Sequence, residues 1–197
     1  MFIQHLKFRI KAMTLALIIF IVIAKNTAYA GEACVFFDPT IFFGLVGHVA
    51  WGWEVDDSTT YVFGSDDGPN NGNICGGPKI WSQTNGTRSD MLNWFKNRNY
   101  SSYNCQPVSN FAVGSANTAI TTVKSQPYYW ASIPCLKTSS TNCLDDVMAI
   151  LNAYNATGLP STSILSHGAP DPRTWFGELG TSGNSNGGKW LTSSQSL

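Results

Sequence analysis

The chain has 197 residues, with twelve basic and twelve acidic side chains and a formal net charge of zero. This length is enough for one domain with a proper core, and nothing in the composition indicates a second one. A balanced charge without a basic patch argues against a nucleic-acid partner.

Residues 1–30 have the features of a secretory signal peptide. Basic residues lie near the start, an apolar run covers residues 13–24, and Ala28-Tyr29-Ala30 supplies a small-x-small cleavage site. The run is shorter than the roughly twenty residues needed to span a bilayer. We therefore expect cleavage after Ala30 and a secreted or periplasmic protein without a stable membrane span. Cleavage removes four of the twelve basic residues and no acidic one, which leaves a net charge of −4.

The remaining chain divides into a folded domain and a tail. Residues 31–179 carry the apolar and aromatic residues of a core, whereas residues 180–197 are dominated by Gly, Ser, Asn and Thr. We predict an α+β domain over 31–179, in which an antiparallel sheet packs on a helix. Over 180–197 we predict a polar, flexible tail with little fixed structure beyond the contacts of Trp190.

Two β-prone segments predict a hairpin. Residues 45–55 are apolar or aromatic at nearly every position, which is typical of a strand covered on both faces. Residues 56–59 interrupt this pattern, and β-prone residues resume at Thr60. Residues 66–87 are rich in Gly, Pro, Asn and Ser, so we expect a long irregular connection there, held by Cys75.

Shorter elements are predicted further along the chain. Ser89 or Asp90 is a candidate N-cap for a short helix through residues 91–96. Residues 118–123 and 128–133 are rich in residues that favour strands.

The clearest helix begins after Thr141 or Asn142. Apolar residues recur there at helical spacing, and Gly158 and Pro160 follow as end signals. The apolar positions are Leu144, Val147, Met148, Leu151 and Tyr154. Asp145 and Asp146 fall in the first turn, where negative charge favours a helix start.

The chain contains five cysteines, an odd number. They lie at positions 34, 75, 105, 135 and 143. Disulfides persist in an oxidising compartment, so we expect two of them and one free thiol. Our preferred solution leaves Cys143 free and pairs the other four. The alternatives are a disulfide between Cys135 and Cys143, an intermolecular disulfide, or an idle buried thiol.

Cys143 and a histidine supply the minimal parts of a cysteine nucleophile site. Cys143 lies at a predicted helix start, where the backbone N–H groups favour a thiolate and can bind an oxyanion. Without the signal segment, His48 and His167 are the candidate bases. We prefer His48, because it lies on a predicted rigid strand, whereas His167 lies in the Pro/Ser/Gly-rich segment 159–172. The alternative for His48 is a structural, hydrogen-bonded histidine.

Two short motifs carry a resemblance to a known family. Gly47-His48-Val49-Ala50-Trp51 and Asn142-Cys143 resemble motifs of the circularly permuted, NlpC-type papain-like enzymes, which include the relatives of lecithin retinol acyltransferase. In that group the histidine strand comes first, and the cysteine that opens a helix comes last. The resemblance covers residues 44–156 and implies a permuted papain-like fold with Cys143 as nucleophile and His48 as base.

The third polar residue departs from the family pattern. Family members often place a histidine on the next strand, where this chain has Thr60 and Tyr61. Pairing the two predicted strands about their turn, without a bulge, places Asp67 opposite His48. We expect Asp67 to orient the imidazole, with Asp66 and Ser65 as alternatives.

Together these residues predict thiol-based hydrolysis or transfer of an amide or acyl group. Cys143 attacks a carbonyl, His48 takes and returns the proton, and backbone N–H groups of residues 142–144 bind the oxyanion. Peptides of peptidoglycan are the substrates that the resemblance favours, followed by acyl or ester groups. No zinc motif or phosphate loop indicates a metal or cofactor. The competing hypothesis is a non-enzymatic, disulfide-stabilised secreted module that binds a partner through exposed aromatic residues.

Overall fold

The computed structural model describes residues 30–41, 46–55, 59–69, 75–129, 141–161 and 171–197. The predicted signal segment, Cys135 and His167 lie outside these ranges, so the expectations for them are not addressed by the fold.

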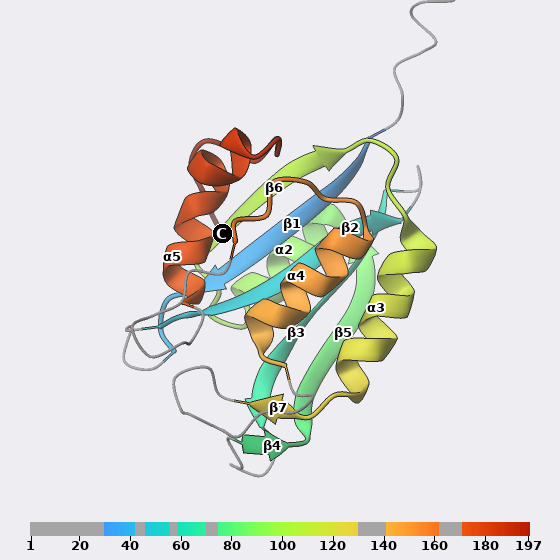
Figure 1. Ribbon diagram of the computed structural model, residues 1–197, viewed down its shortest axis with the longest axis vertical. Coiled ribbons are helices and arrows are strands. Elements are labelled where there is room, and N and C mark those ends of the chain that lie inside the picture. The colour runs from blue at the N-terminus through green and yellow to red at the C-terminus, as the bar shows by residue number, and fades with distance from the viewer. Residues whose placement is uncertain (1–29, 42–45, 56–58, 70–74, 130–140, 162–170) are drawn as a thin grey trace, which may run out of the picture.

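Within the described ranges the protein is α+β, with a six-stranded antiparallel sheet in the order β5-β3-β2-β1-β6-β8. These strands are β1 (Gly31–Asp38), β2 (His48–Val55), β3 (Thr60–Pro69), β5 (Lys79–Thr87), β6 (Ser102–Val108) and β8 (Gln195–Ser196). A second small sheet pairs β4 (Cys75–Gly77) with β7 (Tyr128–Tyr129). The helices are α2 (Arg88–Lys96), α3 (Val113–Ser125), α4 (Cys143–Ala153) and α5 (Pro172–Glu178) (Figure 1).

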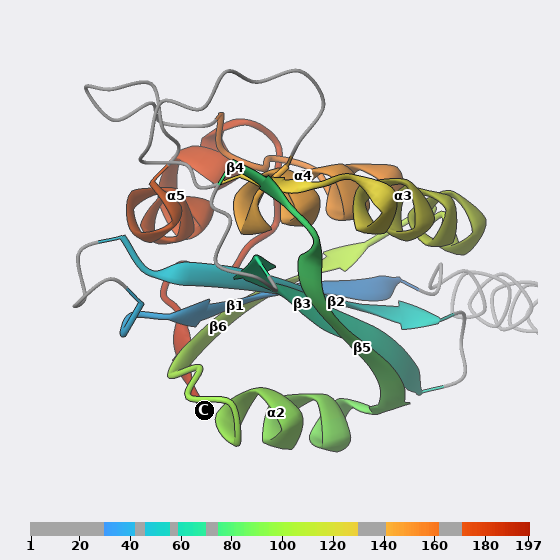
Figure 2. The same cartoon turned by 90° about the horizontal axis from the view of Figure 1, so that it is seen from below.

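The sheet separates two layers of helices. Helices α3, α4 and α5 cover one face, and α2 covers the other (Figure 2). Strands β1 and β2 occupy the middle of the sheet and are buried on both faces, which explains why the residues of β2 are apolar at nearly every position. The predicted hairpin is present as β2 and β3, paired antiparallel.

The core on the α2 side is built from aromatic side chains and one disulfide. Phe36 of β1 stacks on Phe95 of α2 with ring centroids 3.7 Å apart. Cys34 and Cys105 pair directly across β1 and β6, and their sulfurs are joined. This bond ties the two strands together at the centre of the layer.

The core on the other face holds the cysteine-bearing helix in place. Helix α4 buries Leu144, Val147, Ile150 and Leu151 against the sheet, and Trp51 and Trp53 of β2 belong to the same cluster. The helical spacing predicted from the sequence is therefore confirmed. None of the described helices is long and apolar enough to cross a membrane.

The strand predicted over residues 118–123 is wrong, because these residues belong to helix α3. Its buried residues Ala116, Ile120 and Val123 lie on one face, and this packing overrides the strand preference of threonine and valine. Thr121 and Thr122 instead donate their hydroxyls to carbonyls four residues earlier in the helix.

The region 66–87 also differs from the expected irregular connection. Strand β3 continues to Pro69, and β5 runs over nine residues along the edge of the sheet. Residues of β5 are polar because most of them are exposed, so the sequence offered no alternating apolar pattern. The cap of α2 is Thr87 and not Ser89 or Asp90.

The last eighteen residues carry more fixed structure than the sequence predicted. A π-helical turn, η1 (Leu179–Gly183), follows α5, and β8 pairs with β6. Trp190 is buried, and its backbone N–H and carbonyl both bind the side chain of Asn184. Side-chain amides of this kind satisfy the backbone of a polar segment without a regular strand or helix.

Candidate active site

Helix α4 presents Cys143 at its first turn. Asn142 is the N-cap: its Oδ1 accepts hydrogen bonds from the N–H groups of Leu144 and Asp145, at 2.9 and 3.1 Å. Asp145 completes a capping box by accepting from the N–H of Asn142. Cys143 is buried and carries a free thiol.

His48 lies at the first residue of β2, in the middle of the sheet. Gly47 precedes it with φ of +74°, a conformation that favours glycine, and a Cβ at this position would collide with the ring of Phe37. On one side His48 lies opposite Asp38 of β1, whose carboxylate accepts from the N–H and hydroxyl of Thr40. The imidazole therefore lies at the end of a central strand of the sheet.

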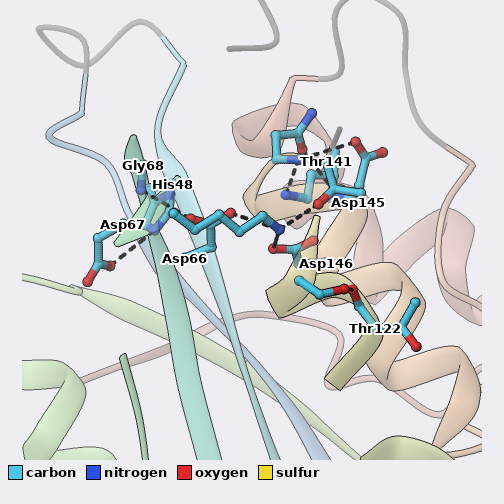
Figure 3. Close-up of polar contacts among 12 residues, drawn as sticks. His48, Asp66, Asp67, Gly68, Thr122, Thr141, Asp145 and Asp146 are labelled. Atoms are coloured by element: carbon cyan, nitrogen blue, oxygen red, sulfur yellow. Dashed lines mark hydrogen bonds and ion pairs between the residues drawn. The ribbon is translucent and has the colours of Figure 1, made fainter. Parts of the chain in front are cut away.

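Asp67 approaches His48 from the neighbouring strand. The pairing of β2 with β3 has the register assumed from the sequence, with Trp51 opposite Gly64. Nε2 of His48 and Oδ1 of Asp67 are 3.6 Å apart, an ion-pair contact slightly longer than a hydrogen bond (Figure 3). The other carboxylate oxygen accepts from Nη1 of Arg98 at 3.2 Å.

The two alternatives to Asp67 have different surroundings. Asp66 forms an ion pair with Lys79, which also binds Asp146 of α4 (Figure 3). Ser65 is fully buried. Of the three candidates, Asp67 is the one in ion-pair contact with the imidazole.

Charge at the site favours the protonated form of His48. Burial alone would lower its pKa, but the negative charge of Cys143 and the contacts with Cys143 and Asp67 outweigh burial and raise the pKa to about 10. Reciprocally, contact with His48 lowers the pKa of Asp67 despite the burial that opposes this shift. At neutral pH the protonated form of His48 is therefore favoured, with the carboxylate of Asp67 beside it.

A cavity of about 400 Å³ brings these groups together. Cys143, His48, Asp67 and Asn142 all line it, although they come from β2, β3 and the start of α4. Its volume lies in the range of pockets that bind small ligands.

The backbone donors beside the thiol are fewer than the sequence suggested. Of residues 142–144, Asn142 and Leu144 already donate their N–H groups within the capping box. In the described part of the chain, the N–H of Cys143 has no hydrogen-bond acceptor. Cys143 thus offers the backbone donor for an oxyanion.

A buried ion cluster lies next to the site. Nζ of Lys79, on β5, is 2.5 Å from Asp146 and 3.3 Å from Asp66, and all three side chains are at most 1% exposed. Lys79 also donates to Thr141, just before the cap of α4. Burial raises the pKa of Asp66 to about 8, so one proton is held by this pair of carboxylates at neutral pH.

Sequence reasoning missed several residues around the cavity. Tyr100 is buried with its ring centroid 5.9 Å from that of His48, and burial raises the pKa of its phenol well above the usual value. Arg98 stacks on Trp94 at 4.0 Å while it binds Asp67. These residues and Lys79 occupy turns or an exposed strand, where no periodic signal marks them.

Among the described residues, one group has metal-ligand chemistry, Glu32 with Cys34 and Cys105, and its two sulfurs are already joined in the disulfide. Comparison of the chain with protein-family models, curated proteins and solved structures gives no match. The chemistry must therefore be argued from the site.

Proposed function

We propose that the protein is a secreted cysteine-nucleophile hydrolase or acyl transferase that acts on amide or acyl bonds. The observation that carries this proposal is the convergence of Cys143, His48 and Asp67 on one cavity. A free thiol at a helix start, an imidazole in contact with it and a carboxylate behind the imidazole are the parts that acyl transfer to a thiol requires.

The reaction starts from a thiolate on Cys143 and an imidazolium on His48. The sulfur bonds to the carbonyl carbon, and the electron pair of the carbonyl moves to its oxygen, which the N–H of Cys143 stabilises. Collapse of this intermediate breaks the bond to the leaving group. The leaving group takes the proton of His48, and a thioester remains on Cys143.

The second half of the reaction restores the enzyme. Water or another acceptor attacks the thioester while the neutral His48 takes its proton. Collapse then releases the acid or the transferred acyl product and regenerates the thiolate. Asp67 orients the ring and stabilises the imidazolium throughout.

The permuted papain-like fold is part of the same proposal. It is supported by the chain order of His48 before Cys143, by the antiparallel β2–β3 hairpin and by the helix that opens at Asn142-Cys143. From this fold we infer peptides of peptidoglycan as the first substrate class and acyl or ester groups as the second. A location outside the cytoplasm is consistent with the Cys34–Cys105 disulfide.

The test uses the purified protein with a p-nitrophenyl acyl ester and with peptidoglycan fragments. We expect release of p-nitrophenolate and an acyl adduct on Cys143 detected by peptide mass analysis. Cys143→Ala should lose both while keeping its circular dichroism spectrum. If the wild-type protein forms no adduct and hydrolyses none of these substrates faster than Cys143→Ala, the catalytic proposal is wrong, and binding of peptidoglycan without turnover would indicate a binding module.

A further inference from the structure

The side-chain amide of Asn142 has a donor without an acceptor. Asn142 is 2% exposed, and its Nδ2 makes no hydrogen bond in the described part of the chain. The Nδ2 atom has almost no exposed surface, so the free energy lost by stripping the amide of water is not recovered in the resting protein. An unsatisfied buried donor of this kind calls for a functional explanation.

The capping box fixes the orientation of this amide. Oδ1 accepts hydrogen bonds from the N–H groups of Leu144 and Asp145. The amide nitrogen could not take its place, because an amide NH2 group donates hydrogen bonds but does not accept them. The assignment of oxygen and nitrogen is therefore determined by the helix itself. With Oδ1 directed at the helix N–H groups, Nδ2 is held on the other edge of the amide plane.

Asn142 also lines the cavity that contains Cys143 and His48. The adjacent N–H of Cys143 is the backbone donor that the capping box leaves unused. Oxyanion sites are built from such preorganised donors, both backbone N–H groups and asparagine or glutamine side chains. Two unused donors thus lie on consecutive residues, and one of these residues is the nucleophile itself.

We infer that Asn142 is a catalytic residue whose Nδ2 donates to the oxyanion, together with the N–H of Cys143. This inference rests on the proposed acyl transfer at Cys143. It assigns two tasks to one side chain: Oδ1 caps helix α4, and Nδ2 receives the charge that develops on the substrate oxygen. Because the donor finds its acceptor when the tetrahedral intermediate forms, its contribution falls on turnover and not on substrate binding.

Two substitutions separate these tasks. Serine and aspartate are both good N-caps, so Asn142→Ser and Asn142→Asp retain the helix start and lose Nδ2. The serine hydroxyl is too short to reach the position of Nδ2, and aspartate has the shape of asparagine but no donor. Asn152→Ser, at an exposed position on the same helix, is the matched control.

The experiment compares two reactions of the same thiol. Acylation by a p-nitrophenyl ester passes through an oxyanion, whereas alkylation by iodoacetamide does not. We expect Asn142→Ser to lower kcat for the ester by about 100-fold, with KM, the alkylation rate and the thermal midpoint close to wild type. Asn142→Asp should lower kcat at least as much, and Asn152→Ser should leave all four quantities unchanged.

Other results would overturn the inference. A kcat within about threefold of wild type in both cap-preserving variants shows that Nδ2 is not an oxyanion donor. An equal loss in the rates of acylation and alkylation would show that Asn142 supports the reactivity of the thiol or the helix start, and not the oxyanion. A wild-type protein whose Cys143 is alkylated but never acylated refutes the proposed function itself, and the inference falls with it.

Discussion

Asp66 and Asp67 are consecutive residues of β3 whose side chains point to opposite faces and serve different clusters. Asp66 lies against Lys79 and Asp146, whereas Asp67 contacts His48 and Arg98 (Figure 3). Asp146 is on the helix that begins at Cys143. The end of β3 therefore contacts the cluster beside the cysteine-bearing helix through Asp66 and contacts His48 through Asp67.

His48 should be essential for the reactivity of Cys143. We expect His48→Ala to reduce kcat by about 1,000-fold or more, and to slow alkylation of Cys143 at pH 7 by at least about tenfold, because no imidazolium then lies beside the thiolate. His167→Ala should retain most of the activity. Both variants are measured by ester turnover and by the rate of iodoacetamide labelling, with circular dichroism as the check on folding. Equal labelling rates in His48→Ala and wild type would contradict the ion pair.

Asp67 should influence turnover more than substrate binding. Asp67→Asn keeps the shape of the side chain but removes the charge that stabilises the imidazolium, so we expect kcat to fall by about 100-fold with little change in KM. Asp90→Asn, at the start of α2 and away from the cavity, is the control. A larger change in KM than in kcat would assign Asp67 to substrate binding.

Lys79 should be important for stability. Removing one member of a buried ion cluster leaves uncompensated charge, so Lys79→Met should lower the free energy of unfolding by about 3–5 kcal/mol in denaturant titrations. Lys124→Met, at an exposed position on α3, should have little effect. Adding Asp66→Asn and Asp146→Asn to Lys79→Met removes the buried charges and should restore part of the loss. A single Lys79→Met variant as stable as Lys124→Met would disprove the role of the cluster.

Stability should decrease as the pH rises. The pKa of His48 is about 10 in the folded protein, compared with its ordinary value of 6.5. Its contribution to the free energy of unfolding is therefore complete below pH 6.5 and is lost as the pH approaches 10. The pKa of Asp66 is likewise raised, from 3.8 to about 8, so this group also lowers the stability as the pH rises through that range. The thermal midpoint should therefore be higher at pH 6 than at pH 9.5. His48→Gln should flatten the curve between pH 8 and 10, and an unchanged slope in this variant would exclude His48 as the cause.

The remaining cysteines should form a second disulfide. Cys34 is bonded to Cys105 and Cys143 is free, which leaves Cys75 and Cys135 as the pair. Non-reducing peptide mapping should recover one peptide that joins Cys75 to Cys135 and one alkylated peptide that contains Cys143. Each disulfide should contribute about 2–4 kcal/mol to stability. A peptide linking Cys135 to Cys143 would contradict both the pairing and the nucleophile.

The sequence by itself determined the elements whose local signals agree with their packing. Helix α4 has an N-cap, acidic first-turn residues and apolar residues at helical spacing, and the β2–β3 hairpin has an apolar strand and a polar turn. Because strand residues pair at fixed intervals, the position of the turn also predicted that Asp67 lies opposite His48.

Only the tertiary structure decided the rest. Residues 118–123 became helical because their apolar positions bury against the core, and β5 formed because β3 offered a partner to a polar segment. The contacts of Lys79 with Asp66 and Asp146, and of Arg98 with Asp67, join residues distant in sequence, for which no local pattern exists. The unused Nδ2 of Asn142 likewise follows from burial and from the hydrogen bonds of its Oδ1, which the sequence does not specify.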